Sequence, residues 1–230
     1  MDKKIHRFLI ASIPEAHSFA ITEEKLVHQL GRVLRMSRGD SIILFTDGGP
    51  DVLVQITDVS KKEIQVEVIS TTENTSTPSR SVTVFLSVIR RERFEVAVEK
   101  LTELGVSEIV PLLTHRTVRE SVRIDRLQAI SDEALEQCGG NKRVKISEPL
   151  SLADSFIHSS SPAIILDMHG DKTVTKLPEM VSLYIGPEGG WSAEDYEVFE
   201  QHTLYKLSLG SRVLRAETAA IIGAHTLLCL

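Results

Sequence analysis

The chain has 230 residues, 42% apolar and 25% charged, which is typical of a globular protein with a substantial core. Its formal net charge of −6 argues against unspecific coating of nucleic acid, although it allows a local basic patch. No apolar run approaches the length of a membrane span, and Pro14 and Glu15 follow the first apolar stretch too early for a good signal peptide. We therefore expect a cytoplasmic protein with no membrane partner.

Cysteine and histidine usage gives no sign of a metal centre. Cys138 and Cys229 are too few for a disulfide framework or a zinc cluster, and they suit a reducing compartment. The histidines lack the H-E-x-x-H spacing of metalloenzymes, so metal catalysis is disfavoured.

Short β-like runs dominate residues 1–70. A helical pattern at residues 22–40 interrupts them, with leucines and valines on one face. The runs lie at residues 6–11, 40–47, 52–60 and 63–70, with turn residues between them. This pattern predicts a small antiparallel barrel or sheet, followed by a polar linker at residues 71–80.

Strands and helices alternate over residues 81–230. Strands are expected at 81–89, 108–113, 163–168, 181–185 and 204–209, and helices at 92–104, 126–138 and 216–230. Gly105 is placed to end the first helix, whereas Asp125 and Gly139 are placed to cap and end the second. Short apolar strands separated by helices predict an α/β domain with a mostly parallel sheet.

The segment YIGPEGGWS joins the strand at 181–185 to a helix. Ser192 and Asp195 fit a capping box, and Trp191 and Tyr196 fall at the positions of a hydrophobic staple. The glycines before them leave backbone N–H groups free to face a ligand at the carboxyl end of the strand. A tight structural turn is the alternative interpretation.

A second segment, LSLGSRVLRAETAA, repeats the order strand, glycine, loop and helix, which predicts one pocket shared by both loops. The sequence lacks G-x-x-x-x-G-K-[ST] and G-x-G-x-x-G, the phosphate-binding motifs. A ligand recognised by backbone groups and apolar walls therefore fits better than a triphosphate or a dinucleotide.

These two segments closely resemble the paired motifs of the RsmE-type 16S rRNA uridine-N3 methyltransferases, which belong to the SPOUT superfamily. The resemblance extends to HRFLI, HQLGRVLRMSRGD, RFEVAVEKLTELGVSEIVPLLTHRTV and ISDEALEQCGG, in the expected order along nearly the whole chain. It implies a PUA-like RNA-binding barrel at residues 1–70 and, at 81–230, a SPOUT domain whose C-terminus forms a trefoil knot. It also implies a homodimer.

The resemblance further implies that S-adenosylmethionine binds in the loops at residues 166–170, 185–190 and 209–216. Small residues there would let the backbone approach the cofactor closely. The cofactor-binding residues expected by match are Leu166, Gly170, Ile185, Gly186, Pro187, Glu188, Gly189, Gly190, Leu209, Gly210, Val213, Leu214 and Ala216.

The sequence departs from the family pattern at two places. Gly140 stands where the family usually has an arginine, and Arg143 is the nearest candidate to replace it. Trp191 stands where the family usually has phenylalanine, a mild change for a staple residue.

Methylation of uridine N3 requires that its proton leave while charge develops on the carbonyl oxygens. We expect Arg215 to orient the substrate and Glu217 to accept the proton. In the alternative interpretation, Glu217 caps the helix and Arg215 forms a salt bridge to it. We expect Glu188 to hold its own loop rather than to act in catalysis, and Thr218 and Ala219 to serve helix packing.

Basic residues cluster at two places. Arg32 and Arg35 are three positions apart on the expected helix, and Arg90, Arg91 and Arg93 form a second group. In the alternative interpretation, these arginines lie on an ordinary solvent-exposed surface and contact no RNA. The residues expected to contact RNA are Arg7, Arg32, Arg35, Arg38, Arg91, Arg116 and Arg212.

The leading hypothesis is S-adenosylmethionine-dependent methylation of a uridine at N3 in 16S rRNA, either naked or in the assembled small subunit. The alternatives are a SPOUT methyltransferase acting at another RNA position and a non-catalytic RNA-binding protein that keeps the knotted scaffold. Open glycine loops argue against the last alternative.

Overall fold

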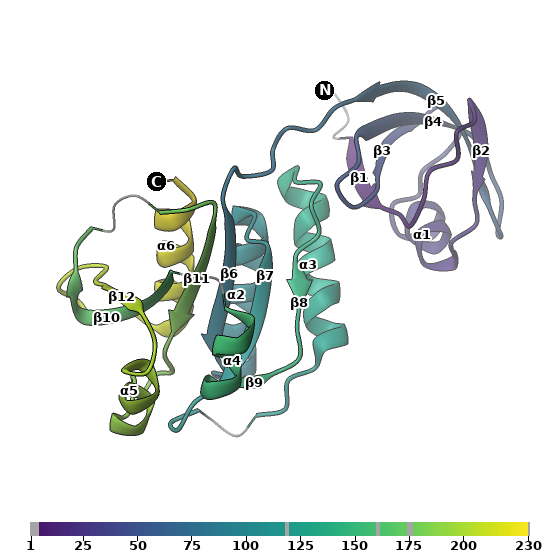
Figure 1. Cartoon of the computed structure of the whole chain (residues 1–230). Coiled ribbons are helices and arrows are strands. Elements are labelled where there is room, and N and C mark those ends of the chain that lie inside the picture. The colour runs from purple at the N-terminus through teal and green to yellow at the C-terminus, as the bar shows by residue number, and fades with distance from the viewer. Residues whose placement is uncertain (1–4, 118–119, 160–161, 174–176, 230) are drawn as a thin grey trace. The chain divides into compact units, whose positions relative to one another are not determined.

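The computed structural model describes residues 5–117, 120–159, 162–173 and 177–229. The chain divides into two compact units, one of residues 1–77 with 135–142 and the other of residues 78–134 with 143–230 (Figure 1). Among the described residues, no helix is long and apolar enough to cross a membrane.

The first unit is built on a sheet with strand order β1-β3-β4-β5-β2. The neighbours β3–β4, β4–β5 and β5–β2 are antiparallel, as expected, but β1 and β3 pair in parallel. The expected antiparallel sheet is therefore confirmed except at β1–β3, where the chain passes through β2 and a helix before it returns as β3. The strands are β1 (His6–Leu9), β2 (Ser18–Ile21), β3 (Ser41–Phe45), β4 (Asp51–Val59) and β5 (Ile64–Thr72).

The helix expected at residues 22–40 is shorter than predicted. It begins as α1 (Glu24–His28), continues as the π-helical turn η1 (Gln29–Val33), and then leaves helical geometry at Arg35, whose φ is 52°. The N–H of Leu34 bonds to the carbonyl oxygen of Gln29 at 2.9 Å, which is the wider π-helical spacing. Arg32 and Arg35 therefore do not share one helical face.

The second unit contains a sheet with order β12-β10-β11-β6-β7-β8, and β9 pairs with β7. All pairs among its described strands are parallel, which confirms the expected α/β architecture. The strands are β6 (Ser81–Ser87), β7 (Glu108–Leu113), β8 (Lys145–Ile146), β9 (Leu150–Ser151), β10 (Ala163–Asp171), β11 (Met180–Ile185) and β12 (Leu204–Leu207).

Helices cover both faces of this sheet (Figure 1). Alternate residues of a strand point to opposite faces, so Val84 packs with α2, α3 and α6, whereas Phe85 packs with α4 and α5. The helices are α2 (Arg91–Leu104), α3 (Ile124–Cys138), α4 (Leu152–His158), α5 (Ala193–Phe199) and α6 (Ala216–Cys229).

The residues predicted to begin and end helices were largely correct. Gly105 follows α2 with a left-handed φ of 82° and donates to carbonyls of the last turn, as expected. Asp125 is not an N-cap, because α3 begins one residue earlier and the N–H of Leu127 already bonds to the Arg123 carbonyl. The strand order does not by itself establish the trefoil knot, which stays a prediction.

Candidate functional site

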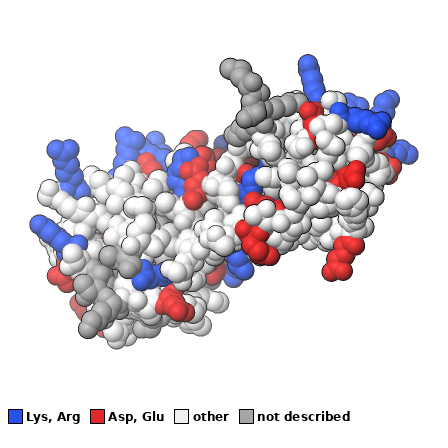
Figure 2. Space-filling model, turned by 90° about the horizontal axis from the view of Figure 1, so that it is seen from above, with Lys and Arg blue, Asp and Glu red and all other residues white. Residues whose placement is uncertain are grey.

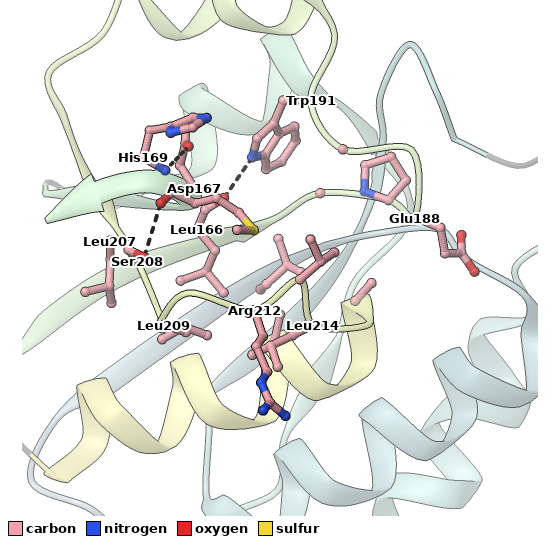
Figure 3. Close-up of a pocket in the computed structure, with 18 of the residues that line it drawn as sticks. Leu166, Asp167, His169, Glu188, Trp191, Leu207, Ser208, Leu209, Arg212 and Leu214 are labelled. Atoms are coloured by element: carbon pink, nitrogen blue, oxygen red, sulfur yellow. Dashed lines mark hydrogen bonds between the residues drawn. The ribbon is translucent and has the colours of Figure 1, made fainter. Parts of the chain in front are cut away.

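Three neighbouring parallel strands end at the same edge of the second sheet. A cavity of about 440 Å³ lies between the irregular second half of β10 and the loops that follow β11 and β12, and it is here called the three-loop cavity (Figure 3). The segment expected as a loop at residues 166–170 lies within β10, where the pairing with β12 is interrupted after Leu166. This volume lies within the usual range for small-molecule sites. Its lining comprises residues 166–169, 185–191, 207–210, 212–214, Tyr196, Ala216 and Ala219.

Hydrogen bonds tie the three loops to one another. The indole Nε1 of Trp191 donates to the carbonyl oxygen of Leu166 at 3.0 Å. The Ser208 hydroxyl donates to the carbonyl oxygen of Met168 at 3.3 Å (Figure 3). These two bonds join the loop after β11 and the loop after β12 to the second half of β10, so the cavity wall is preorganised.

Gly186 and Gly190 are required by the shape of the second loop. A Cβ on Gly186 would lie 3.2 Å from the Trp191 ring, which is tighter than ordinary packing. Gly190 has a φ of 67° and closes a turn by donating to the Pro187 carbonyl at 2.9 Å. The glycines thus let Trp191 lie against the chain where it reaches Leu166.

The expected capping box is present at the start of α5. The Ser192 hydroxyl accepts from the N–H of Asp195, and the Asp195 carboxylate accepts from the N–H of Ser192. Trp191 and Tyr196 both pack against Phe199, with ring centroids 4.8 and 6.1 Å from it. This end of the loop is therefore fixed by both polar and apolar contacts.

Asp167, which lies in the segment expected to bind the cofactor at residues 166–170, and Tyr196, expected only as a staple residue, form a polar wall of the cavity. The Tyr196 hydroxyl donates to Asp167 Oδ2 at 2.6 Å, and the N–H of His169 donates to Oδ1 at 2.8 Å. Partial burial raises the pKa of Asp167, but these hydrogen bonds outweigh it and hold the pKa below its usual value. Burial and the neighbouring carboxylate raise the pKa of Tyr196 to about 12.

The residues expected to bind the cofactor lie together. All of them line the three-loop cavity except Gly170. A Cβ on Gly170 would lie 2.6 Å from the carbonyl carbon of Lys206, so this glycine permits close approach of β10 to β12.

Arg116, an expected RNA contact, supports the second loop from outside. Its Nη1 donates to the carbonyl oxygens of Gly189 and Trp191 at 2.8 and 3.3 Å. The neighbouring His115 uses its backbone N–H to bond to the Asp195 carboxylate at 3.2 Å. Both residues therefore contact the glycine loop and its capping box.

The salt bridge between Glu217 and Arg215, which was the alternative interpretation, is absent among the described residues. Glu217 is only 12% exposed, and it faces Arg93 rather than Arg215, with 3.9 Å between Arg93 Nε and Glu217 Oε1. Glu217 Oε2 is buried and has no hydrogen-bond partner among the described residues. Arg215 is exposed and has no ion-pair partner within the described part of the chain.

Arg7, another expected RNA contact, is committed to packing inside the first unit. Its side chain is 11% exposed and bonds to the Asp51 carboxylate at 2.7 Å and the Gly140 carbonyl at 3.1 Å. The guanidinium also lies 4.4 Å from the centroid of the Phe45 ring. This arrangement favours a structural role.

Arg32, Arg35 and Arg38 are all exposed. Arg32 lines a groove of the first unit together with Lys61 and Lys62, which the sequence patterns did not single out. On the face that Figure 2 shows, Lys and Arg side chains stand in small groups among acidic residues. A local basic groove therefore coexists with the negative net charge.

The remaining arginines differ in exposure and in whether they form ion pairs. Arg212 is exposed at the cavity, whereas the side chain of Arg91 pairs with Glu95 at 3.5 Å. Arg143, the candidate to replace the family arginine, pairs with Asp132 at 2.6 Å. At Gly140 a Cβ would lie 2.9 Å from Leu135 Cδ1, so a larger residue there requires that side chain to move.

Family models match both parts of the chain. An RNA methyltransferase domain matches residues 75–228, and an RNA methyltransferase PUA domain matches residues 21–69. Proteins named Ribosomal RNA small subunit methyltransferase E are similar to it. The one from Rickettsia conorii is 28% identical over 95% of this chain and 93% of its own length, and that from Bacillus subtilis is 28% identical over 91% and 89%.

Solved structures agree with the fold. A methyltransferase from Legionella pneumophila, solved in complex with S-adenosylmethionine, is 28% identical with a TM-score of 0.87 over 98% of this chain and 97% of its own. A Ribosomal RNA small subunit methyltransferase E from Neisseria gonorrhoeae is 23% identical with a TM-score of 0.88 over 96% and 95%. The expected order of a PUA-like domain and an α/β methyltransferase domain is thereby confirmed. The chain belongs to the RNA methyltransferase family, with its methyltransferase domain at residues 75–228 and its PUA domain at residues 21–69.

Proposed function

We propose that this protein transfers a methyl group from S-adenosylmethionine to N3 of a uridine in 16S rRNA. Family membership and the names of the relatives support an rRNA methyltransferase. The Legionella pneumophila structure with bound S-adenosylmethionine supports the cofactor. The observation that carries the proposal is the three-loop cavity, which lies beside the second half of β10 and at the carboxyl ends of β11 and β12.

The residues of the cavity suit this cofactor. Gly186 and Gly190 allow the backbone to approach a ligand, and Leu166, Leu209 and Leu214 supply apolar walls for an adenosine. The cofactor would bring an electrophilic methyl group on a sulfonium, which has no phosphate to neutralise. The absence of a P-loop lysine from the glycine loop is consistent with that chemistry.

Glu217 is the proposed proton acceptor. The bond from N3 to its hydrogen breaks, the proton passes to Glu217 Oε2, and the N3 electron pair forms the bond to the methyl carbon. The carbon–sulfur bond breaks with its electrons on sulfur, leaving a neutral thioether. Oε2 has no hydrogen-bond partner among the described residues, so it has an unused capacity to accept an N–H donor once bound RNA reaches this buried atom.

Arg215 is the proposed substrate-orienting residue. Its exposed guanidinium, without an ion-pair partner among the described residues, could donate to a uracil carbonyl oxygen that gains negative charge. Exposed Arg32, Arg35 and Arg38 would contact RNA phosphates, which position the substrate without specifying sequence.

We also propose a cytoplasmic homodimer. The dimer is carried over from the family resemblance of the two glycine-loop segments. Light scattering should give twice the mass of the chain, and a monomer at all tested concentrations would contradict the dimer.

Calorimetry and single-turnover methylation test the site. The wild-type protein should bind S-adenosylmethionine and methylate small-subunit RNA. Glu217→Gln should keep the cofactor affinity but slow methyl transfer by about 100-fold, as expected when a general base is lost. A folded wild-type protein that does not bind the cofactor would contradict the proposal, and Glu217→Gln with the wild-type rate would remove the role of Glu217.

A further inference from the structure

Arg93 links two carboxylates that come from different parts of the second unit. It lies in the first turn of α2, where its Nη1 donates to Glu188 Oε1 at 3.1 Å. Its Nε lies 3.9 Å from Glu217 Oε1 at the start of α6. One guanidinium therefore connects the glycine wall of the cavity to the carboxylate proposed as proton acceptor.

The two oxygens of Glu217 have different surroundings. Oε1 faces the guanidinium, whereas Oε2 is buried without a hydrogen-bond partner among the described residues. A buried charge needs a nearby opposite charge, and here Arg93 supplies it while leaving one oxygen unused. That division suits a carboxylate that must stay in place and still accept a proton.

Lys100 shows what an ordinary surface bridge on the same helix looks like. It also contacts two carboxylates, Glu99 and Glu103, each at 2.7 Å, but these are 44% and 38% exposed. Water can solvate both, so breaking such pairs costs little. Glu217 is only 12% exposed, so its cation is much harder to replace by water.

We propose that Arg93 is a positioning residue for methyl transfer, which holds Glu217 with one oxygen available to the uridine N3–H and ties it through Glu188 to the cofactor wall. The basic group predicted at residues 90–93 thus includes an arginine engaged at the site rather than one free for RNA phosphates. This inference rests on the proposed function, because it deepens the role of Glu217.

Single-turnover rates at saturating cofactor and RNA test the inference, together with cofactor affinity by calorimetry and thermal melting. Arg93→Ala should slow methyl transfer by at least about tenfold, with a cofactor dissociation constant within about threefold of wild type. Arg93→Lys should recover part of the rate, since an ammonium restores the charge but not the two-sided geometry. Lys100→Ala should match the wild type.

A double variant separates positioning from general support of the fold. Arg93→Ala combined with Glu217→Gln should be no slower than Glu217→Gln alone, within about threefold, because both changes disable one unit. If Arg93→Ala does not fold, Arg93→Lys and Arg93→Gln are compared in the same cycle.

Three results would overturn the inference: a wild-type rate for Arg93→Ala, multiplicative losses in the double variant, or a slowing explained entirely by weaker cofactor binding. A wild-type protein that neither binds the cofactor nor methylates RNA would instead overturn the proposed function. The two failures are therefore distinguishable.

Discussion

At the scale of single residues, the absence of a side chain at Gly186 controls the shape of the three-loop cavity. Trp191 lies over this glycine and at the same time bonds to the carbonyl oxygen of Leu166 in the neighbouring strand β10. Any Cβ at position 186 therefore presses on the indole and, through it, on the hydrogen bond that joins the two loops.

Substitution at Gly186 should weaken cofactor binding in proportion to the size of the new side chain. Gly186→Ala requires a shift of a few tenths of an ångström, so a loss of several-fold is expected, and Gly186→Val should lose at least about tenfold. Calorimetry with S-adenosylmethionine measures both, and melting curves verify that the variants fold. Equal affinities across the series would show that the Trp191 contact does not shape the binding site.

The sequence motifs located most of this cavity but missed the partners of Glu217 and the role of Arg7. Gly186 was found because it follows its strand directly, and Gly210 because it lies three residues after β12 in a motif of the same order. Arg93 and Glu217 lie on different helices, and Arg7 meets residues from other strands and from the segment at residues 135–142. Pairings of this kind depend on the folded topology, which periodicity does not report.

At the scale of elements, the capping box fixes where α5 begins and hence where the glycine loop ends. Ser192 is 2% exposed, so both of its hydrogen bonds with Asp195 are shielded from water. The cap therefore supports the wall of the cavity as well as the helix.

Ser192→Ala should destabilise the protein by about 1 kcal/mol, the usual cost of removing an N-cap hydroxyl. It should also weaken cofactor binding, because Trp191 precedes it directly. Ser151→Ala is the matched control, because Ser151 is the N-cap of α4 and does not line the cavity. Its hydroxyl accepts a hydrogen bond from the N–H of Asp154 at 3.1 Å. Denaturant unfolding and calorimetry should show lower stability for both and weaker binding for Ser192→Ala alone. Equal binding losses would contradict this account.

Elements with strong local sequence signals were predicted well, whereas short or irregular elements were not predicted. The strand at residues 108–113 and the end of α2 at Gly105 were correct because their signals are contiguous. The two-residue strands β8 and β9 carry no periodicity, and the turn at Gln29–Val33 became π-helical within a helix-like pattern. Leu30 within this turn is fully buried, and such tertiary packing is not visible in the periodicity of the sequence.

At the scale of the whole molecule, the PUA domain and the methyltransferase domain divide recognition from chemistry in this proposal. The exposed arginines of the first unit, with Lys61 and Lys62 beside Arg32, offer phosphate contacts. The parallel β1–β3 pair in that unit was not foreseen, because strand-like runs indicate neither partner nor direction.

Charge reversal at Arg32 and Arg35 tests whether the exposed arginines of the first unit contact RNA. Arg32→Glu with Arg35→Glu should weaken RNA binding and lower the salt slope of the affinity by about 1 for each lost phosphate contact. Arg123→Glu with Lys145→Glu makes the same change in net charge at exposed ion pairs of the second unit. Filter binding over a range of salt should separate the two pairs, and identical salt slopes would remove Arg32 and Arg35 from the RNA surface.

The central claim is that this protein methylates one uridine of 16S rRNA at N3. Mass mapping of modified nucleotides compares rRNA from cells that have the protein, cells that lack it, and cells complemented with wild type or Glu217→Gln. We expect a single N3-methyluridine to disappear without the protein, to return with the wild type, and to stay absent or strongly reduced with Glu217→Gln. An unchanged set of 16S rRNA modifications in cells that lack the protein would contradict the claim.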